Sequence, residues 1–212
     1  MKEKENIADV VILGAWNKYI LSPDWVKNNL FPDEESIQFQ LPLNIDASLK
    51  FTTNDLTLGI IKDRFEFSLI HKTEPVLRKT ASILRILARL LPHTPIVSIG
   101  INNLYVCSLE EAVGHVDFEA PDIKRLAAHG TPLQMQGFMR QMKIKNHCVL
   151  NLRVQRDENA QEVVFDFNYD YSLNGLSEVP SILGDEDDIL WQKRLEMQSI
   201  LREVYGFTEK IG

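Results

Sequence analysis

Apolar and polar residues alternate without interruption from Ile37 to Phe51. A period of two residues places successive side chains on opposite faces of a β-strand, so this pattern predicts one strand with one buried face. Pro42 lies within the segment and has no backbone N–H to donate, which is typical of an edge strand or of a bend.

Two apolar segments follow, over 55–61 and 64–70, and two residues separate them. A tight turn between these segments, and another at 52–54, brings every apolar side chain of the three strands to one face. The patterns therefore predict a three-stranded antiparallel meander. The expected cross-strand pairs are Leu58 with Phe67, Ile60 with Phe65, Leu56 with Leu69, Leu49 with Leu58 and Phe51 with Leu56.

A helix is expected after the meander, with Thr73 as its N-cap, Pro75 in its first turn and Pro92 beyond its end. Its apolar residues cover more than one stripe, which predicts burial on about two sides. The other elements expected in this half are a strand over 7–13, a helix capped by Ser22 and Pro23, and a strand over 95–106.

The second half of the chain has a similar order of elements. Its strands are expected over 133–145, 146–156 and 161–171, and its helix over 185–205, where an acidic first turn suits the helix dipole. The register expected for the last hairpin pairs Leu150 with Phe167, Asn151 with Asp166 and His147 with Asp170. The segment 108–132 lacks the alternation and is interpreted as a connector with a short helix over 122–129.

These patterns predict an α+β fold of antiparallel meander sheets with helices packed on one face, arranged as two pseudo-repeated β-β-β-α units. The units are expected at 1–107 and 133–212 with the connector 108–132 between them, or else as one continuous domain of 212 residues. The nominated core residues are Phe39, Leu41, Leu49, Leu58, Phe67, Leu84, Leu87, Ile99, Leu150, Leu152, Phe165 and Phe167.

Met135, Met139 and Met142 form an apolar cluster at the start of the second half. Helical spacing and strand spacing both describe the cluster, so its secondary structure stays open. Methionine-rich surfaces serve as adaptable partner sites, whereas a plain role as core filler is the commoner alternative.

The composition is that of an ordinary globular protein, with 44% hydrophobic and 25% charged residues, which argues against a disordered or collagen-like chain. No apolar run approaches the roughly 20 residues that cross a bilayer, and the charged N-terminal residues do not resemble a signal peptide. Two cysteines are too few for a disulfide framework. We therefore expect a cytoplasmic protein with no membrane partner.

The charges are unevenly distributed along a chain whose net charge is −7. The stretches 75–109 and 123–156 contain no acidic residue but hold 11 of the 23 basic ones. A positive face built from them would steer an anionic partner, although the acidic whole disfavours nucleic acid and neutralisation within the fold is the simpler alternative. The candidate anion-binding residues are Arg140, Lys143, Lys145, Arg153 and Arg156.

Two histidine–aspartate pairs are the candidate catalytic groups. His115 and Asp117 share a face if their segment is extended, and His147 is expected opposite Asp170. A neighbouring carboxylate raises the pKa of an imidazole toward the range useful for proton transfer. No nucleophile is expected beside His147 and Asp170, whereas His115 and Asp117 would suit a metal ligand or the orientation of a base. The alternating polar residues 166–170 lack the glycine and glutamate of an EF-hand loop. We expect neither a metal site nor a cofactor.

Three hypotheses for the function follow. The preferred one is a non-enzymatic protein that binds another protein or its own copies, because long strands at sheet edges pair readily with a partner's edge. The second is contact with an anion or a nucleic acid through the two basic stretches. The third is a metal-dependent or His/Asp hydrolase that uses some of the histidine–aspartate residues.

Overall fold

The computed structural model describes residues 1–5, 7–17, 19–41, 48–61, 63–118, 123, 125, 135–145 and 147–208, with only the backbone of Lys145. The strands are β1 (Lys2–Glu3), β2 (Val10–Gly14), β3 (Gln38–Gln40), β4 (Leu49–Thr52), β5 (Leu56–Ile61), β6 (Arg64–Leu69), β7 (Ile96–Ser108), β8 (Met135–Lys145), β9 (Cys148–Asp157) and β10 (Glu162–Ser172). The helices are α1 (Pro23–Leu30), α2 (Glu74–Leu90), α3 (Leu109–Ala112), the 3-10 helix η1 (Leu176–Glu178), α5 (Val179–Leu183) and α6 (Ile189–Glu203).

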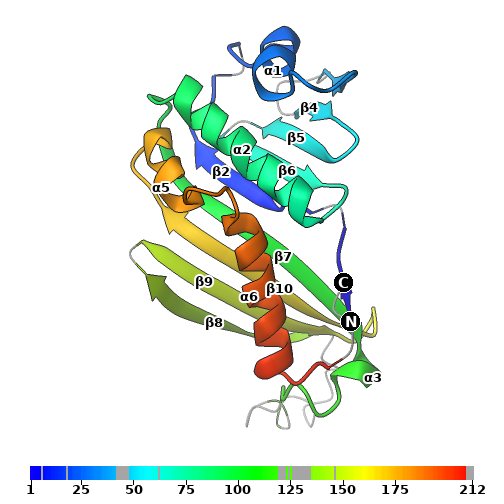
Figure 1. Cartoon of the computed structure of the whole chain (residues 1–212). Helices are drawn as coiled ribbons and strands as arrows, with labels where there is room; N and C mark the ends of the chain where they lie inside the picture. The colour runs from blue at the N-terminus through cyan, green and yellow to red at the C-terminus, as the bar shows by residue number, and fades with distance from the viewer. Residues whose placement is uncertain are drawn as a thin grey trace.

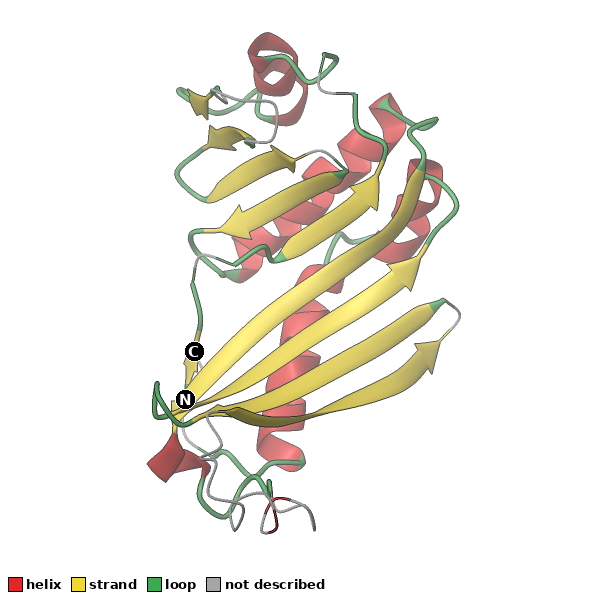
Figure 2. Ribbon diagram, turned by 180° about the vertical axis from the view of Figure 1, so that it is seen from behind, coloured by secondary structure: helices red, strands yellow, loops and turns green. Residues whose placement is uncertain are grey.

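The strands form one ten-stranded antiparallel sheet in the order β3-β4-β5-β6-β2-β7-β10-β9-β8, and β1 pairs with the far end of β7. Helices α2, α5 and α6 pack on one face of this sheet (Figure 1). Figure 2 shows the opposite face, over which no described helix lies. The predicted α+β fold with antiparallel meanders and helices on one face is confirmed.

The two halves of the sheet repeat one strand order. In the first half β2 pairs with β6, which is the last strand of the meander β4-β5-β6 and leads into α2. In the second half β7 pairs in the same way with β10, the last strand of the meander β8-β9-β10, and α6 comes later in the chain. Because β2 and β7 also pair with each other, the strands of both halves belong to one sheet.

The alternation over 37–51 predicted one strand, and this prediction is wrong, because the segment contains the two strands β3 and β4. β3 and β4 pair antiparallel with Phe39 opposite Phe51, so the chain reverses direction between them. Pro42 and its neighbours up to residue 47 lie outside the described residues. The nominated core residues Phe39 and Leu41 are 53% and 65% exposed, because Phe39 lies on the three-residue edge strand β3 and Leu41 directly follows it.

The β5–β6 hairpin has the predicted register, including Leu58 opposite Phe67. Two other registers differ from prediction by two residues: Phe51 pairs with Leu58, and Leu150 pairs with Tyr169. A slip of two residues leaves the same side chains on the buried face, so the hydrophobic pattern cannot detect it.

The core lies between the sheet and its helices. Helix α2 begins after Thr73, has Pro75 in its first turn and ends at Leu90, as predicted. Helix α6 begins at Ile189, later than predicted, because the preceding backbone is left-handed at Gly184 and Asp187. The other nominated core residues are all buried, namely Leu49, Leu58, Phe67, Leu84, Leu87, Ile99, Leu150, Leu152, Phe165 and Phe167.

The helices also bear on three further expectations. No described helix is long and apolar enough to span a membrane. The short helix expected over 122–129 lies almost wholly outside the described residues. The first helix, α1, follows Ser22, whose hydroxyl accepts a hydrogen bond from the backbone N–H of Trp25 at 3.3 Å, as expected of an N-cap.

Candidate functional site

Strand β8 forms one edge of the sheet, and among the described strands it pairs with β9 alone. It is 11 residues long, whereas β3 at the other edge has three residues. Figure 2 shows the outer side of β8 along the lower right margin of the sheet. An edge strand presents unpaired backbone N–H and C=O groups, which are available to a strand of another chain.

Large apolar side chains are exposed along β8. Met139 is 62% exposed, Met135 is 57% exposed, and Met142 and Ile144 are more than a third exposed. The methionine cluster is therefore part of a strand and not core filler. Met135 and Met139 also line a shallow hollow of about 460 Å³ beside Arg153 on β9. Flexible methionine side chains suit a surface that adapts to a partner.

A row of four side-chain amides crosses this half of the sheet on the face without helices. Gln141, Asn151, Asn168 and Asn102 are direct cross-strand neighbours on β8, β9, β10 and β7. The hydrogen bonds run from Gln141 Nε2 to Asn151 Oδ1 (3.0 Å), Asn151 Nδ2 to Asn168 Oδ1 (3.0 Å), Asn168 Nδ2 to Asn102 Oδ1 (2.7 Å) and Asn102 Nδ2 to the Ala8 carbonyl (2.8 Å). Each amide donates toward Ala8, so the row has one direction.

At the free edge this amide row ends with unused hydrogen-bonding capacity. The described contacts of the Gln141 side chain comprise one hydrogen bond, which its Nε2 donates to Asn151. A glutamine amide has two N–H donors and an acceptor oxygen, so one donor and Oε1 remain at the edge. Sequence reasoning missed the row because it expected Asn151 opposite Asp166, two residues away from its actual partner Asn168.

The open face beside the row carries charge of both signs. Arg153 lies between Met139 on β8 and Asp166 on β10. Burial raises the pKa of Asp166, and the positive charge of Arg153 partly opposes that shift. Lys143, two residues beyond Gln141 on β8, is exposed on the same face.

The five candidate anion-binding residues are divided between the two faces of the sheet. Arg140 and Arg156 share the helix face, because Arg140 lies opposite the buried Leu152 and Arg156 lies opposite the buried Val163. Lys143 and Arg153 share the open face. The side chain of Lys145 lies outside the described residues. Anion contact through β8 and β9 stays a prediction. The cationic side chains that would make it are divided between the two faces of the sheet.

Many of these cations have partners within the fold. The guanidinium of Arg140 lies 4.4 Å from the centre of the Phe138 ring, and Arg156 pairs with Glu158 at 2.6 Å. The basic residues of α2 form the pairs Arg78–Glu74 (2.9 Å), Lys79–Asp55 (2.9 Å) and Arg85–Asp187 (2.5 Å). Neutralisation within the fold therefore accounts for most of the first basic stretch.

The prediction that His147 faces Asp170 is wrong, because the hairpin register is shifted by two residues. Asp170 lies opposite Val149, and His147 occupies the β8–β9 turn with a φ of 64°. The backbone carbonyl of His147 accepts a hydrogen bond from the N–H of Ser172 at 3.0 Å. The two side chains therefore do not form the expected cross-strand pair.

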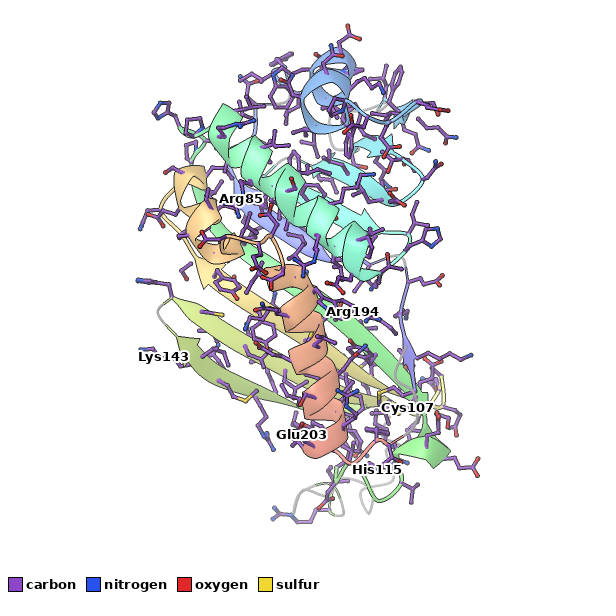
Figure 3. All side chains as sticks on the ribbon, viewed as in Figure 1. Arg85, Cys107, His115, Lys143, Arg194 and Glu203 are labelled. Atoms are coloured by element: carbon purple, nitrogen blue, oxygen red, sulfur yellow. The ribbon has the colours of Figure 1, made fainter. Side chains whose placement is uncertain are left out.

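The second pair, His115 and Asp117, lies at the other end of the sheet. Nδ1 of His115 donates to the backbone carbonyl of Tyr205 at 2.7 Å, and its ring stacks on Phe207. Asp117 lines a separate hollow of about 350 Å³. Figure 3 shows His115 beyond the C-terminal end of α6, far from Lys143 at the opposite end of the long strands. The two histidine–aspartate pairs therefore do not combine into one site.

Neither described cysteine resembles a reactive thiol. Cys107 and Cys148 are both buried, and burial raises the pKa of Cys107 to about 11. A thiol of raised pKa carries little of the thiolate that acts as nucleophile and metal ligand. Among the described residues, no group of three or more His, Cys, Asp or Glu side chains is placed to hold a metal ion.

A buried ionic cluster joins the N-terminal segment to the rest of the fold, and sequence reasoning missed it. Lys72 Nζ lies 2.7 Å from Asp9 Oδ1 and 3.3 Å from Glu3 Oε1, and Arg194 Nη2 lies 2.6 Å from Glu3 Oε2. Oδ2 of Asp9 accepts the backbone N–H of Leu69. Burial raises the pKa of Asp9 to about 6, although Lys72 opposes the shift.

Chemistry-bearing side chains are thus dispersed, whereas exposed apolar residues and polar groups with unused hydrogen-bonding capacity gather along β8. Comparison with protein-family models, with curated proteins and with solved structures gave no match. The geometry of the chain itself is the basis on which a function is assigned.

Proposed function

We propose that the protein acts by binding another protein chain, which adds a strand to its sheet at β8. The observation that carries the proposal is the 11-residue edge with its exposed methionines. In strand addition, main-chain hydrogen bonds supply affinity, and alternate side chains supply specificity. At a rise of about 3.3 Å per residue, such an edge offers pairing over roughly 35 Å.

Two features distinguish this edge from an unprotected, aggregation-prone strand. Arg140 and Lys143 place positive charge on it, and its pairing with β9 shifts register between Lys143 and Lys145. Charged residues and bulges on an edge strand disfavour indiscriminate pairing. They restrict the partner to a strand whose register keeps these cations away from other cations.

The proposal is tested by removing apolar contact at one edge and leaving the other as control. Met139→Lys on β8 and Phe39→Lys on β3 each place a lysine at a side chain that is more than half exposed. Native mass spectrometry on protein purified at low salt from its own cells would show any bound chain as mass above 24.4 kDa.

We expect Met139→Lys to lose the bound mass and Phe39→Lys to keep it, with both variants folded under the conditions of the measurement. Met139→Lys should unfold at a slightly lower temperature than the wild type, because its lysine lies opposite Arg153 on β9. Equal retention in both variants, equal loss in both, or a bare chain in the wild type would each overturn binding at β8.

A further inference from the structure

We infer that the chain bound at β8 is β8 of a second copy, paired antiparallel about a two-fold axis at Gln141. The inference rests on the proposed function and adds the partner and the register. The two sheets then form one continuous sheet, with the helices of both copies on the same side. In such a pair, facing residues must share a face of the sheet.

Charge restricts the register. A two-fold axis at Arg140 or at Lys143 would set two identical cations directly opposite each other, and like charges in that position are destabilising. An axis at Gln141 places Lys143 opposite Met139 of the second copy, and Arg140 opposite Met142. No cation then faces a cation.

The amide row selects Gln141 among the registers that avoid like charges. Each Gln141 holds a free N–H and a free Oε1 at the edge, since its described hydrogen bond goes inward to Asn151. Facing residues in an antiparallel pair have Cβ atoms about 5 Å apart, within reach of two glutamine side chains. Each glutamine can donate to the other, so the two rows join into one that runs between the Ala8 carbonyls of the two copies.

The same register covers the exposed apolar surface of β8. Met139, which is 62% exposed, lies beside the alkyl stem of Lys143 of the second copy, and Met142 lies beside that of Arg140. Long cationic side chains cover apolar surface with their stems and keep the charge in water. Self-pairing therefore uses both the methionines and the cations of the edge.

A charge swap at the axis tests the inference. Gln141→Glu and Gln141→Lys each set two like charges face to face, so we expect both to weaken self-association about tenfold or more in sedimentation equilibrium. An equimolar mixture of the two variants should regain the wild-type association, because a mixed pair sets a glutamate opposite a lysine at the axis. A different partner at β8 would respond to the two substitutions in opposite directions, and mixing would restore nothing, which would overturn the inference.

Disulfide trapping tests the register separately. Gln141→Cys should form a cross-linked dimer under mild oxidation, because the two positions face each other across the axis. Met135→Cys is the matched control: it is exposed on the same face of β8, yet the two copies of this residue would lie about 40 Å apart along the strands. A cross-link at Met135→Cys, or none at Gln141→Cys, would overturn the register.

The outcomes separate the two proposals. If the wild type sediments as a monomer while Met139→Lys releases a different protein, the second-copy inference fails and the proposed function stands. If Met139→Lys releases no chain of any kind, both fail.

Discussion

Gly100 has no side chain, and the Asn168 amide fills the space above it. A Cβ at this position would lie 2.9 Å from Asn168 Nδ2, so the amide must move and lose its hydrogen bond to Asn102. We expect Gly100→Ala to lower the free energy of unfolding by about 1–2 kcal/mol, as measured by urea denaturation. Gly59→Ala on β5 is the control, because its nearest neighbour is 4.0 Å away. An equal loss in both variants would contradict the steric explanation.

Asp9 gives the stability of the protein a specific pH dependence. Burial raises its pKa from 3.8 to about 6. A raised carboxyl pKa means that the folded state holds a proton which the unfolded chain has released, so the stabilisation is complete below pH ~4 and is lost as the pH rises through about 6. The charges that act on Asp9 are those of Lys72 and Glu3, and Glu3 in turn pairs with Arg194.

Asp9→Asn removes this titration. Between pH 4 and pH 7 we expect the free energy of unfolding of the wild type to fall by about 2 kcal/mol relative to the variant. Chemical denaturation of both proteins across this range is the measurement. A difference that does not change with pH would show that Asp9 titrates normally.

At the scale of elements, α6 holds β1 on the sheet through a buried ion pair. The side chains of Arg194 and Glu3 are 14% and 6% exposed, and breaking a buried pair leaves an uncompensated charge. We expect Arg194→Ala to cost about 3 kcal/mol and to expose the N-terminal segment to proteolysis. Arg78→Ala removes a comparable but exposed ion pair with Glu74 and should cost less than about 1 kcal/mol. A similar loss of unfolding free energy in both variants would contradict the role of the Arg194–Glu3 pair in holding β1 on the sheet.

Elements whose limits depend on local pattern could be predicted, as α2 and the β5–β6 hairpin show. The β9–β10 register could not be predicted, because the turn ends later than expected. Asp157 still belongs to the ladder, where it pairs with Glu162, and it accepts the N–H groups of Asn159 and Ala160. Gln161, expected to begin the next strand, belongs to the turn with a φ of 55°. An aspartate at the start of a turn is a known signal, and it alone could have corrected the pairing.

The candidate site was predictable only in its parts. The methionines and the cations of β8 are visible in the sequence. The position of β8 at an edge of the sheet is not, because the one edge that the sequence indicated was at Pro42, and the amide row depends on the corrected register. The ionic cluster depends on four residues far apart in the chain, Glu3, Asp9, Lys72 and Arg194, for which no local pattern exists.

At the scale of the whole molecule, the central β2–β7 pair makes one sheet of the two meanders. We therefore expect both halves to unfold together. Trp16 and Trp25 report on the first half and Trp191 reports on the second, so fluorescence separates the two. Two variants make the comparison: Trp191→Phe, and the double variant Trp16→Phe/Trp25→Phe. In each variant we expect the urea midpoint from fluorescence to equal the midpoint from circular dichroism. A different fluorescence midpoint for the tryptophans of each half would show that the halves unfold as independent units.

The amide row also carries a polarity that is set at its inner end. The Ala8 carbonyl can only accept, so Asn102 must turn its NH₂ group toward it, and every amide outward to β8 must take the same orientation. The backbone that follows β1 thereby sets the orientation of the Gln141 amide, which leaves one N–H and Oε1 for an approaching chain. Release of Ala8 from its place beside Asn102 would free all four amides to turn over together, and Gln141 would then hold two N–H groups at the edge instead of one. The position of Ala8 would in this way be coupled, through hydrogen bonds alone, to the donors and acceptors that β8 offers to a partner.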